Sequence, residues 1–185
     1  MAETQKRPRE QKIKIGIVDT MFARVDMAAF AIDEINKKSP GNVKIVRSTV
    51  PGIKDLAIGC VVLDKKENCD IYLALGMVGK EPIDTQCGHE ASLGMQMAKM
   101  KLSKHIVEVF VHEAEGRGEA DLYSIFENRT RKHAMNAFLL IYDSATLTKF
   151  AGKGKRQGRE DAGPLNKGAG KRNPPQDTTR RYVYE

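Results

Sequence analysis

Two histidine–glutamate pairs are the residues of this sequence best suited to moving protons. His89 and Glu90 are adjacent near the start of a predicted helix, and His112 and Glu113 are adjacent after an apolar run. An imidazole titrates near neutral pH, so a histidine in a ligand site can act as a general acid or base. Neither pair belongs to an HExxH motif, and the pairs therefore favour proton transfer over a metal centre.

A segment with glycine and lysine indicates a second kind of chemistry, ligand binding. It runs from Gly76 through Gly79 to Lys80 and follows the apolar run at residues 71–75. Glycines let a backbone approach a ligand closely, and free amide groups beside a lysine suit an anion or a carbonyl-rich ring. A strand-to-helix loop also carries Gly and Lys for structural reasons, so both interpretations stay open on spacing alone.

Two earlier segments add an aromatic ring and a turn. Phe22 lies in a predicted loop, where its ring could stack on a flat heterocycle or cover the apolar face of the next helix. Pro51 and Gly52 would present backbone amides at a helix N-terminus, a site for an anion or a carbonyl group. Asp55 lies in the following helical turn, where interaction with the helix dipole is the simpler explanation.

These residues are carried by strands that alternate with helices. Short apolar runs predict strands at residues 12–18, 43–50, 71–75 and 106–111. Amphipathic stripes and flanking turn residues predict helices at about 24–37, 53–66, 91–102, 120–142 and 144–150. The order predicts an α/β fold, a three-layer sandwich around a four-stranded parallel sheet in the order 2-1-3-4. In such a sheet, ligands bind outside the carboxyl ends of the strands, where the segments described above would meet.

Length and composition indicate one domain with terminal extensions. The 185 residues are 41% apolar and contain no run of 18 apolar residues, so we expect no membrane span. The polar N-terminus lacks the apolar segment of a signal peptide, which predicts a cytoplasmic protein. Three cysteines without a CxxC pair predict reduced thiols. We expect residues 1–11 to be disordered, residues 12–164 to form the domain, and residues 165–185 to be a basic, disordered extension.

The positive charge is concentrated near the C-terminus. Residues 1–150 hold 22 Lys+Arg against 20 Asp+Glu, a difference of +2, whereas residues 151–185 hold 9 against 4, a difference of +5. A basic tail can contact RNA. This one contains no aromatic residue before Tyr182, so we expect a solvated tail and no nucleic-acid partner.

Several long segments resemble the archaeal-type riboflavin synthases. They are KIGIVDTMFARVDMA, STVPGIKDLAIGC, CDIYLALGMVGK, HEASLGMQMAK, KHIVEVFVHE and AGKGKRQGREDAGP. The resemblance extends in order over residues 12–164. That family is similar to lumazine synthase, so the resemblance implies a flavodoxin-like, lumazine-synthase-like fold. The extension after Pro164 has no counterpart in the family pattern.

The resemblance implies a reaction and a binding site. Two molecules of 6,7-dimethyl-8-ribityllumazine would react to give riboflavin and 5-amino-6-ribitylaminouracil. The substrate-binding residues it implies are Thr20, Phe22, Ala23, Val50, Pro51, Gly52, Ile53, Asp55, Gly76, Met77, Val78, Gly79 and Lys80.

The resemblance leaves the proton-transfer residue open. The candidates are His89, Glu90, Glu108 and His112. It also implies a homopentamer with sites between subunits, and a divalent cation, magnesium or manganese, for which the sequence gives no ligand set. Two alternatives remain: lumazine synthase, whose RGxTxH segment is replaced here by GKEPID, and a non-catalytic module that binds flavin or RNA.

Overall fold

The computed structural model describes residues 12–39, 41 and 43–165, and its elements alternate along the chain. Their order is β1 Ile13–Thr20, α1 Met27–Lys38, β2 Val43–Val50, the 3₁₀ turn η1 Ile53–Asp55, α2 Leu56–Glu67, β3 Ile71–Val78, α3 Pro82–Leu102, β4 Ile106–His112, the 3₁₀ turn η2 Glu113–Glu115, α4 Glu119–Tyr142 and α5 Ser144–Phe150.

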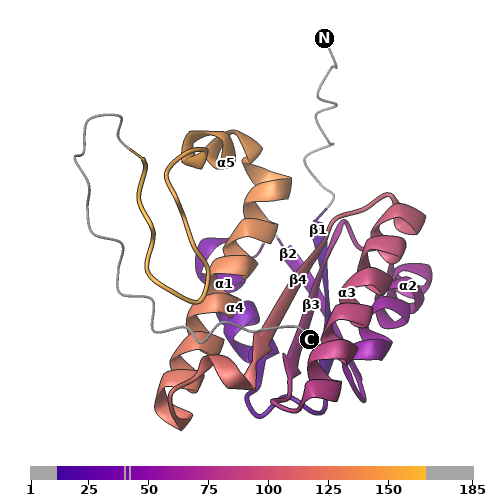
Figure 1. Cartoon of the computed structure of the whole chain (residues 1–185). Helices are drawn as coiled ribbons and strands as arrows, with labels where there is room; N and C mark the ends of the chain where they lie inside the picture. The colour runs from indigo at the N-terminus through magenta and orange to yellow at the C-terminus, as the bar shows by residue number, and fades with distance from the viewer. Residues whose placement is uncertain (1–11, 40, 42, 166–185) are drawn as a thin grey trace.

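The four strands form one parallel sheet in the order β2-β1-β3-β4, as predicted. Helices α1 and α4 cover one face of the sheet, and α2 and α3 cover the other (Figure 1). The three-layer α/β sandwich is therefore confirmed. Because all four strands are parallel, their carboxyl ends lie along a single edge.

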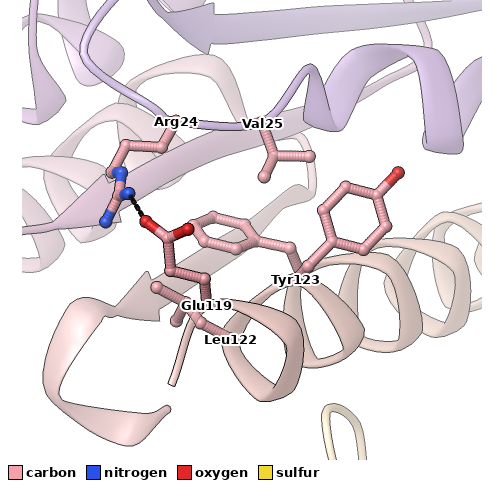
Figure 2. Close-up of a pocket in the computed structure, with 6 residues that line it drawn as sticks. Arg24, Val25, Glu119, Leu122 and Tyr123 are labelled. Atoms are coloured by element: carbon pink, nitrogen blue, oxygen red, sulfur yellow. Dashed lines mark hydrogen bonds and ion pairs between the residues drawn. The ribbon is translucent and has the colours of Figure 1, made fainter. Parts of the chain in front are cut away.

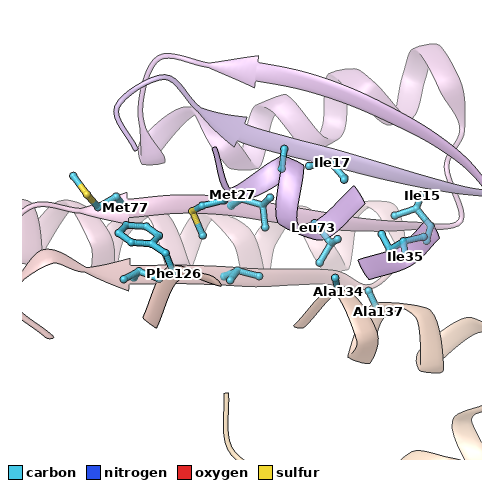
Figure 3. Close-up of a cluster of buried hydrophobic side chains, with 14 of the residues drawn as sticks. Ile15, Ile17, Met27, Ile35, Leu73, Met77, Phe126, Ala134 and Ala137 are labelled. Carbon is cyan, nitrogen blue, oxygen red and sulfur yellow. The ribbon is translucent and has the colours of Figure 1, made fainter. Parts of the chain in front are cut away.

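Two apolar clusters, one on each face of the sheet, hold the layers together. All eight residues of β3 are buried, because this central strand is covered on both faces. On the α1 and α4 side, Ile15, Ile17 and Leu73 pack with Met27 and Phe126 (Figure 3). The opposite cluster joins α2 and α3 to the sheet through residues that include Leu56, Cys60, Tyr72 and Met95.

Strands β1 and β3 are longer than predicted. The first strand was predicted to end at residue 18, but Asp19 and Thr20 pair with Thr49 and Val50 of β2 and so belong to β1. β3 continues through Val78, three residues beyond its predicted end. The loop predicted to begin at Gly76 is thus partly a buried strand, because neighbouring strands supply hydrogen-bond partners that the local sequence does not reveal.

Helix boundaries also differ from the predictions. α1 begins three residues later than expected, at Met27, where the Asp26 carboxylate accepts a hydrogen bond from the Ala29 amide at 3.1 Å. α3 begins at Pro82, far ahead of the apolar stripe at 91–102 that predicted it. Glu81 and Asp84 form a capping box around this start, and proline suits the first helical position.

The C-terminal segment after α5 contains no helix or strand up to residue 165, as predicted. The predicted disorder of residues 1–11 and of the chain beyond Leu165 lies outside the described residues. Within the described part of the chain, no helix is both long and apolar enough to cross a membrane.

We expect Phe126→Ala to lower the free energy of unfolding by about 3–5 kcal/mol, because it empties the middle of the α4 core. Urea denaturation followed by circular dichroism measures this. Phe150→Ala is the matched control, since that ring is 42% exposed and its loss should cost only about 0.5 kcal/mol. Equal losses from the two substitutions would contradict the assignment of Phe126 to the core.

Candidate active site

A cleft of about 430 Å³ opens at the carboxyl edge of the sheet. It lies between the β1–α1 connection, the η1 turn, the end of β3 and the first turns of α3. Its walls are formed by Phe22, Pro51, Gly52, Ile53, Lys54, Asp55, Met77, Gly79, Asp84 and Cys87. Aromatic and aliphatic groups therefore stand beside carboxylates, an ammonium group and a thiol.

The cleft collects residues from three of the segments that the sequence singled out. Phe22, Pro51, Gly52, Ile53, Asp55, Met77 and Gly79 were all predicted to bind substrate. Phe22 is 54% exposed, which favours the stacking interpretation over a role in the core. Asp55 is the N-cap residue of α2 but makes no side-chain capping bond. Its carboxylate is thus not used for capping.

The other predicted binding residues lie around the cleft rather than in its walls. Thr20 and Ala23 line a neighbouring hollow, and Lys80 is exposed beyond the end of β3. Val50 packs against the α2 and α3 cluster, and Val78 is fully buried.

Two glycines of β3 and its extension permit close packing. A Cβ atom on Gly76 would lie 2.8 Å from Cγ2 of Ile53, so Gly76 lets the η1 turn approach the strand. A Cβ atom on Gly79 would lie 2.2 Å from Oδ2 of Asp84. These glycines position the walls of the cleft, and this is a structural role beyond the ligand approach that the sequence suggested.

The β1–α1 connection that carries Phe22 is fastened at both ends. The Met21 amide donates to the Val50 carbonyl at 2.9 Å, which joins the connection to the end of β2. Arg24 reaches across to Glu119 in the first turn of α4 (Figure 2) and forms a second ion pair with Glu113 at 2.9 Å. These bonds place Phe22 relative to the rest of the sheet edge.

The four proposed proton-transfer residues lie on α3 and β4, outside the cleft wall in the described chain. His89 is exposed on α3, and Glu108 lies within β4, where it accepts a hydrogen bond from Ser92 at 2.6 Å. His112 ends β4, and its amide donates to Glu115 at 3.0 Å. Glu90 pairs with Lys54. None of the four lines the cleft in the described part of the chain.

The Lys54–Glu90 pair fixes the charge of both groups. The hydrogen bond from Lys54 is the main cause that lowers the pKa of Glu90, and the same bond raises the pKa of Lys54. Glu90 is therefore ionised at neutral pH. It is better suited to holding the Lys54 side chain at the cleft wall than to donating a proton.

Sequence reasoning missed three wall residues, Lys54, Asp84 and Cys87. The signal that could have revealed two of them is Pro82, which marks the first helical position of α3. A helix that begins there places Asp84 and Cys87 three residues apart on one face, toward the cleft.

The comparisons with known proteins cover nearly the whole of this domain. Residues 12–142 match the family model described as 6,7-dimethyl-8-ribityllumazine synthase. The riboflavin synthase of Methanothermobacter marburgensis is 49% identical over 153 residues, which are 83% of this chain and 99% of that protein. The riboflavin synthase of Archaeoglobus fulgidus is 41% identical over 84% of this chain and 100% of that protein.

The chain belongs to the archaeal-type riboflavin synthase family.

The family resemblance implied a divalent cation, and the structure offers no obvious place for one. Among the described residues, no group of three or more His, Cys, Asp or Glu side chains could hold a metal ion. The described residues of a single chain therefore supply no complete ligand set, and the cation that the resemblance implied stays a prediction.

The three cysteines differ in accessibility. Cys60 and Cys69 are buried, and burial raises the pKa of Cys60 to about 12. Cys87 is partly exposed in the cleft wall. All three are free thiols, as the sequence predicted.

We expect iodoacetamide at pH 8 to alkylate Cys87 well before Cys60 or Cys69, because reaction needs an accessible thiolate. Peptide mass spectrometry at timed intervals measures the three rates. The urea-unfolded protein serves as the control and should react at all three positions. Comparable rates for Cys60 and Cys87 in the folded protein would contradict the described cleft.

Proposed function

We propose that this member of the family is a riboflavin synthase. It would convert two molecules of 6,7-dimethyl-8-ribityllumazine into riboflavin and 5-amino-6-ribitylaminouracil by moving a four-carbon unit from one to the other. The observation that carries the proposal is the 41–49% identity to proteins named riboflavin synthase, which extends over 97–100% of their length.

The cleft has the composition that such a substrate needs. Phe22, Ile53 and Met77 offer apolar surface to a planar ring, and an exposed aromatic side chain can stack on it. Lys54, Asp55 and Asp84 offer hydrogen-bond donors and acceptors for ring carbonyls and the hydroxyls of a ribityl chain. No Cβ atom added to Gly52 would meet another atom within 4 Å among the described residues, so the backbone there is open to a ligand.

The protein's main contribution would be to position two rings. The electron-poor pteridine acidifies its own ring methyl group, so the substrate supplies much of the reactivity. Holding two reactants in the reacting geometry can contribute roughly 7–11 kcal/mol to lowering a barrier. A general acid or base adds typically about 10²–10⁴-fold. The apolar part of the cleft wall, formed by Phe22, Ile53 and Met77, suits the positioning of a planar ring.

Lumazine synthase is the second candidate, because the matching family model carries that description. The segment after β3 argues against it. Lumazine synthases have RGxTxH there, whereas this chain has GKEPID at residues 79–84. In the structure this segment leads into the capping box of α3, with Asp84 in the place where a phosphate-binding site would need positive charge.

We further propose that the chain assembles into a homopentamer, and an exposed apolar face on α2 and α3 supports self-association. Leu93, Met97 and Met100 lie on one face of α3 at helical spacing and are 54%, 74% and 81% exposed. On α2, Ile58 and Val62 are also exposed. Soluble monomers seldom expose large apolar patches, so several exposed apolar side chains on two neighbouring helices favour a second copy as the partner.

The activity test uses 6,7-dimethyl-8-ribityllumazine as the sole substrate. We expect the wild-type protein to form riboflavin, seen by its absorbance and fluorescence, while a lumazine synthase would leave the substrate unchanged.

We expect Phe22→Ala to raise KM by about tenfold or more with an unchanged melting temperature, because a stacked ring and its buried apolar area are lost. A large fall in melting temperature with an unchanged KM would place Phe22 in the core.

We expect Met97→Asp to produce smaller assemblies in light scattering, because a charge at the centre of the apolar face would be buried unpaired on association. Phe150→Asp is the matched control, since Phe150 is exposed on α5, away from that face. Dissociation by both substitutions, or by Phe150→Asp alone, would show that the α2 and α3 face is not the interface.

A further inference from the structure

The segment AGKGKRQGREDAGP, residues 151–164, has no role in the cleft, yet it is built as a rigid element. We name it the strap. It runs back along α4 after α5 (Figure 1) and is tied to that helix by side chains. The Lys132 ammonium donates to the carbonyls of Arg156 and Arg159 at 2.9 and 3.1 Å. The Gly158 amide donates to the side chain of Asn128 at 3.0 Å.

Glycines make the conformation of the strap possible. Gly158 is buried with a φ of +81°, and a Cβ atom there would lie 2.6 Å from Nε of Arg129. Gly154 has a φ of +61°, and a Cβ atom there would lie 2.5 Å from the carbonyl oxygen of Gly163. Residues that carry side chains rarely adopt this left-handed region. Glycine at these two positions therefore permits a conformation that a residue with a side chain would strain.

The strap and α4 border an open cavity of about 510 Å³. Its walls are formed by Arg117, Asp121, Ser124, Ile125, Asn128, Gly158, Arg159 and Glu160. All of these except Ile125 and Gly158 offer polar side chains, so the cavity differs in kind from the cleft, where rings and aliphatic groups face carboxylates.

The charges of the cavity balance. Arg117 and Asp121 are bonded to each other at 3.4 Å between Nε and Oδ2, and the Arg117 amide also donates to Asp121 at 3.0 Å. The side chains of Arg159 and Glu160 in the strap make no hydrogen bond or ion pair with residues in the described ranges. Arg159 has only a longer-range electrostatic attraction to Asp121.

A balanced set of donors and acceptors favours one class of ligand. Two guanidinium groups and two carboxylates give no net attraction for a phosphate. Hydroxyl groups both donate and accept, so a polyhydroxylated chain can satisfy arginine, carboxylate, Ser124 and Asn128 together. The ribityl chain of a lumazine belongs to this class.

The cavity and the cleft share no lining residue. The cavity is bordered by α4, which covers one face of the sheet, whereas the cleft includes residues of α3, which covers the other. A reaction between two lumazines nevertheless needs a second ribityl chain to be held. We propose that the strap, through Arg159 and Glu160, forms a polyol-binding cavity for the ribityl chain of a lumazine that reacts at the cleft of a second copy. This inference rests on the proposed function.

The direct test of the cavity needs no turnover. We would record saturation-transfer difference NMR spectra of ribitol, with inorganic phosphate as the competitor, on the wild-type protein and on Arg159→Gln, Arg156→Gln and Phe22→Ala. Arg156→Gln is the matched control, because its exposed side chain lies outside the cavity while its carbonyl bond to Lys132 is kept. We expect the ribitol signal to fall in Arg159→Gln to the level that the polar groups of the cleft retain, while Arg156→Gln and Phe22→Ala lose less of it. We expect the wild-type signal to resist phosphate.

Kinetics then test the link to the second copy. We expect Arg159→Gln to raise KM by about 10- to 100-fold, the value of one or two charge-assisted hydrogen bonds, with kcat and assembly size little changed. Assemblies that mix Arg159→Gln and Phe22→Ala chains should form riboflavin faster than assemblies of either variant alone. In a random mixture, about one quarter of the interfaces would pair an intact cleft with an intact strap.

Distinct outcomes would overturn each part. A ribitol signal from Arg159→Gln equal to that of the wild type would contradict a polyol site at the strap. Full displacement of ribitol by phosphate would contradict it as well. Mixed assemblies no more active than the mean of their parents would show that strap and cleft do not meet across copies. Absence of riboflavin with wild-type protein would instead overturn the proposed function, and the ribitol experiment would still decide whether the cavity binds a polyol.

Discussion

The burial of β3 on both faces is the constraint on which the rest of the structure depends. A strand of eight buried residues needs apolar cover above and below, and the α1 and α4 pair and the α2 and α3 pair provide it. Two helical layers can be connected to parallel strands only by crossovers, which return every strand end to the same edge. The cleft is a consequence of that return, because four connections are crowded along one edge.

Electrostatic contacts, rather than apolar packing, arrange the connections at this edge. Arg24 joins the β1–α1 connection to η2 and α4, and Lys54 joins η1 to α3. Asp19, buried at the end of β1, accepts hydrogen bonds from Arg47 at 2.6 Å and Thr49 at 2.7 Å. Exposed ion pairs contribute little stability, but here they set the direction of the segment that carries Phe22. The core thus supplies stability, and the charged edge supplies geometry.

Two kinds of binding surface share no residue in the described chain. The cleft offers apolar surface with a few polar groups, which suits a planar ring. The cavity beneath the strap offers polar groups of balanced charge, which suit hydroxyls. An assembly that brings α4 of one copy near the cleft of another could apply both to one reaction. The exposed apolar face on α2 and α3 gives such an assembly a physical cause.

The sequence by itself determined the order of strands and helices, the parallel sheet and the family, because apolar periodicity and long motifs such as VDTMFARVDMA are local signals. It also indicated Phe22, an aromatic residue that is unusual in a loop, and the Pro51–Gly52 turn, whose residue types mark turns. Only the tertiary structure decided that β3 continues through Val78 and that Asp84 and Cys87 reach the cleft. Strand ends depend on partners distant in sequence, and the neighbours of a side chain depend on which helix covers which face. The same reason leaves His89, Glu108 and His112, which the sequence indicated by residue type, outside the cleft wall in the described chain.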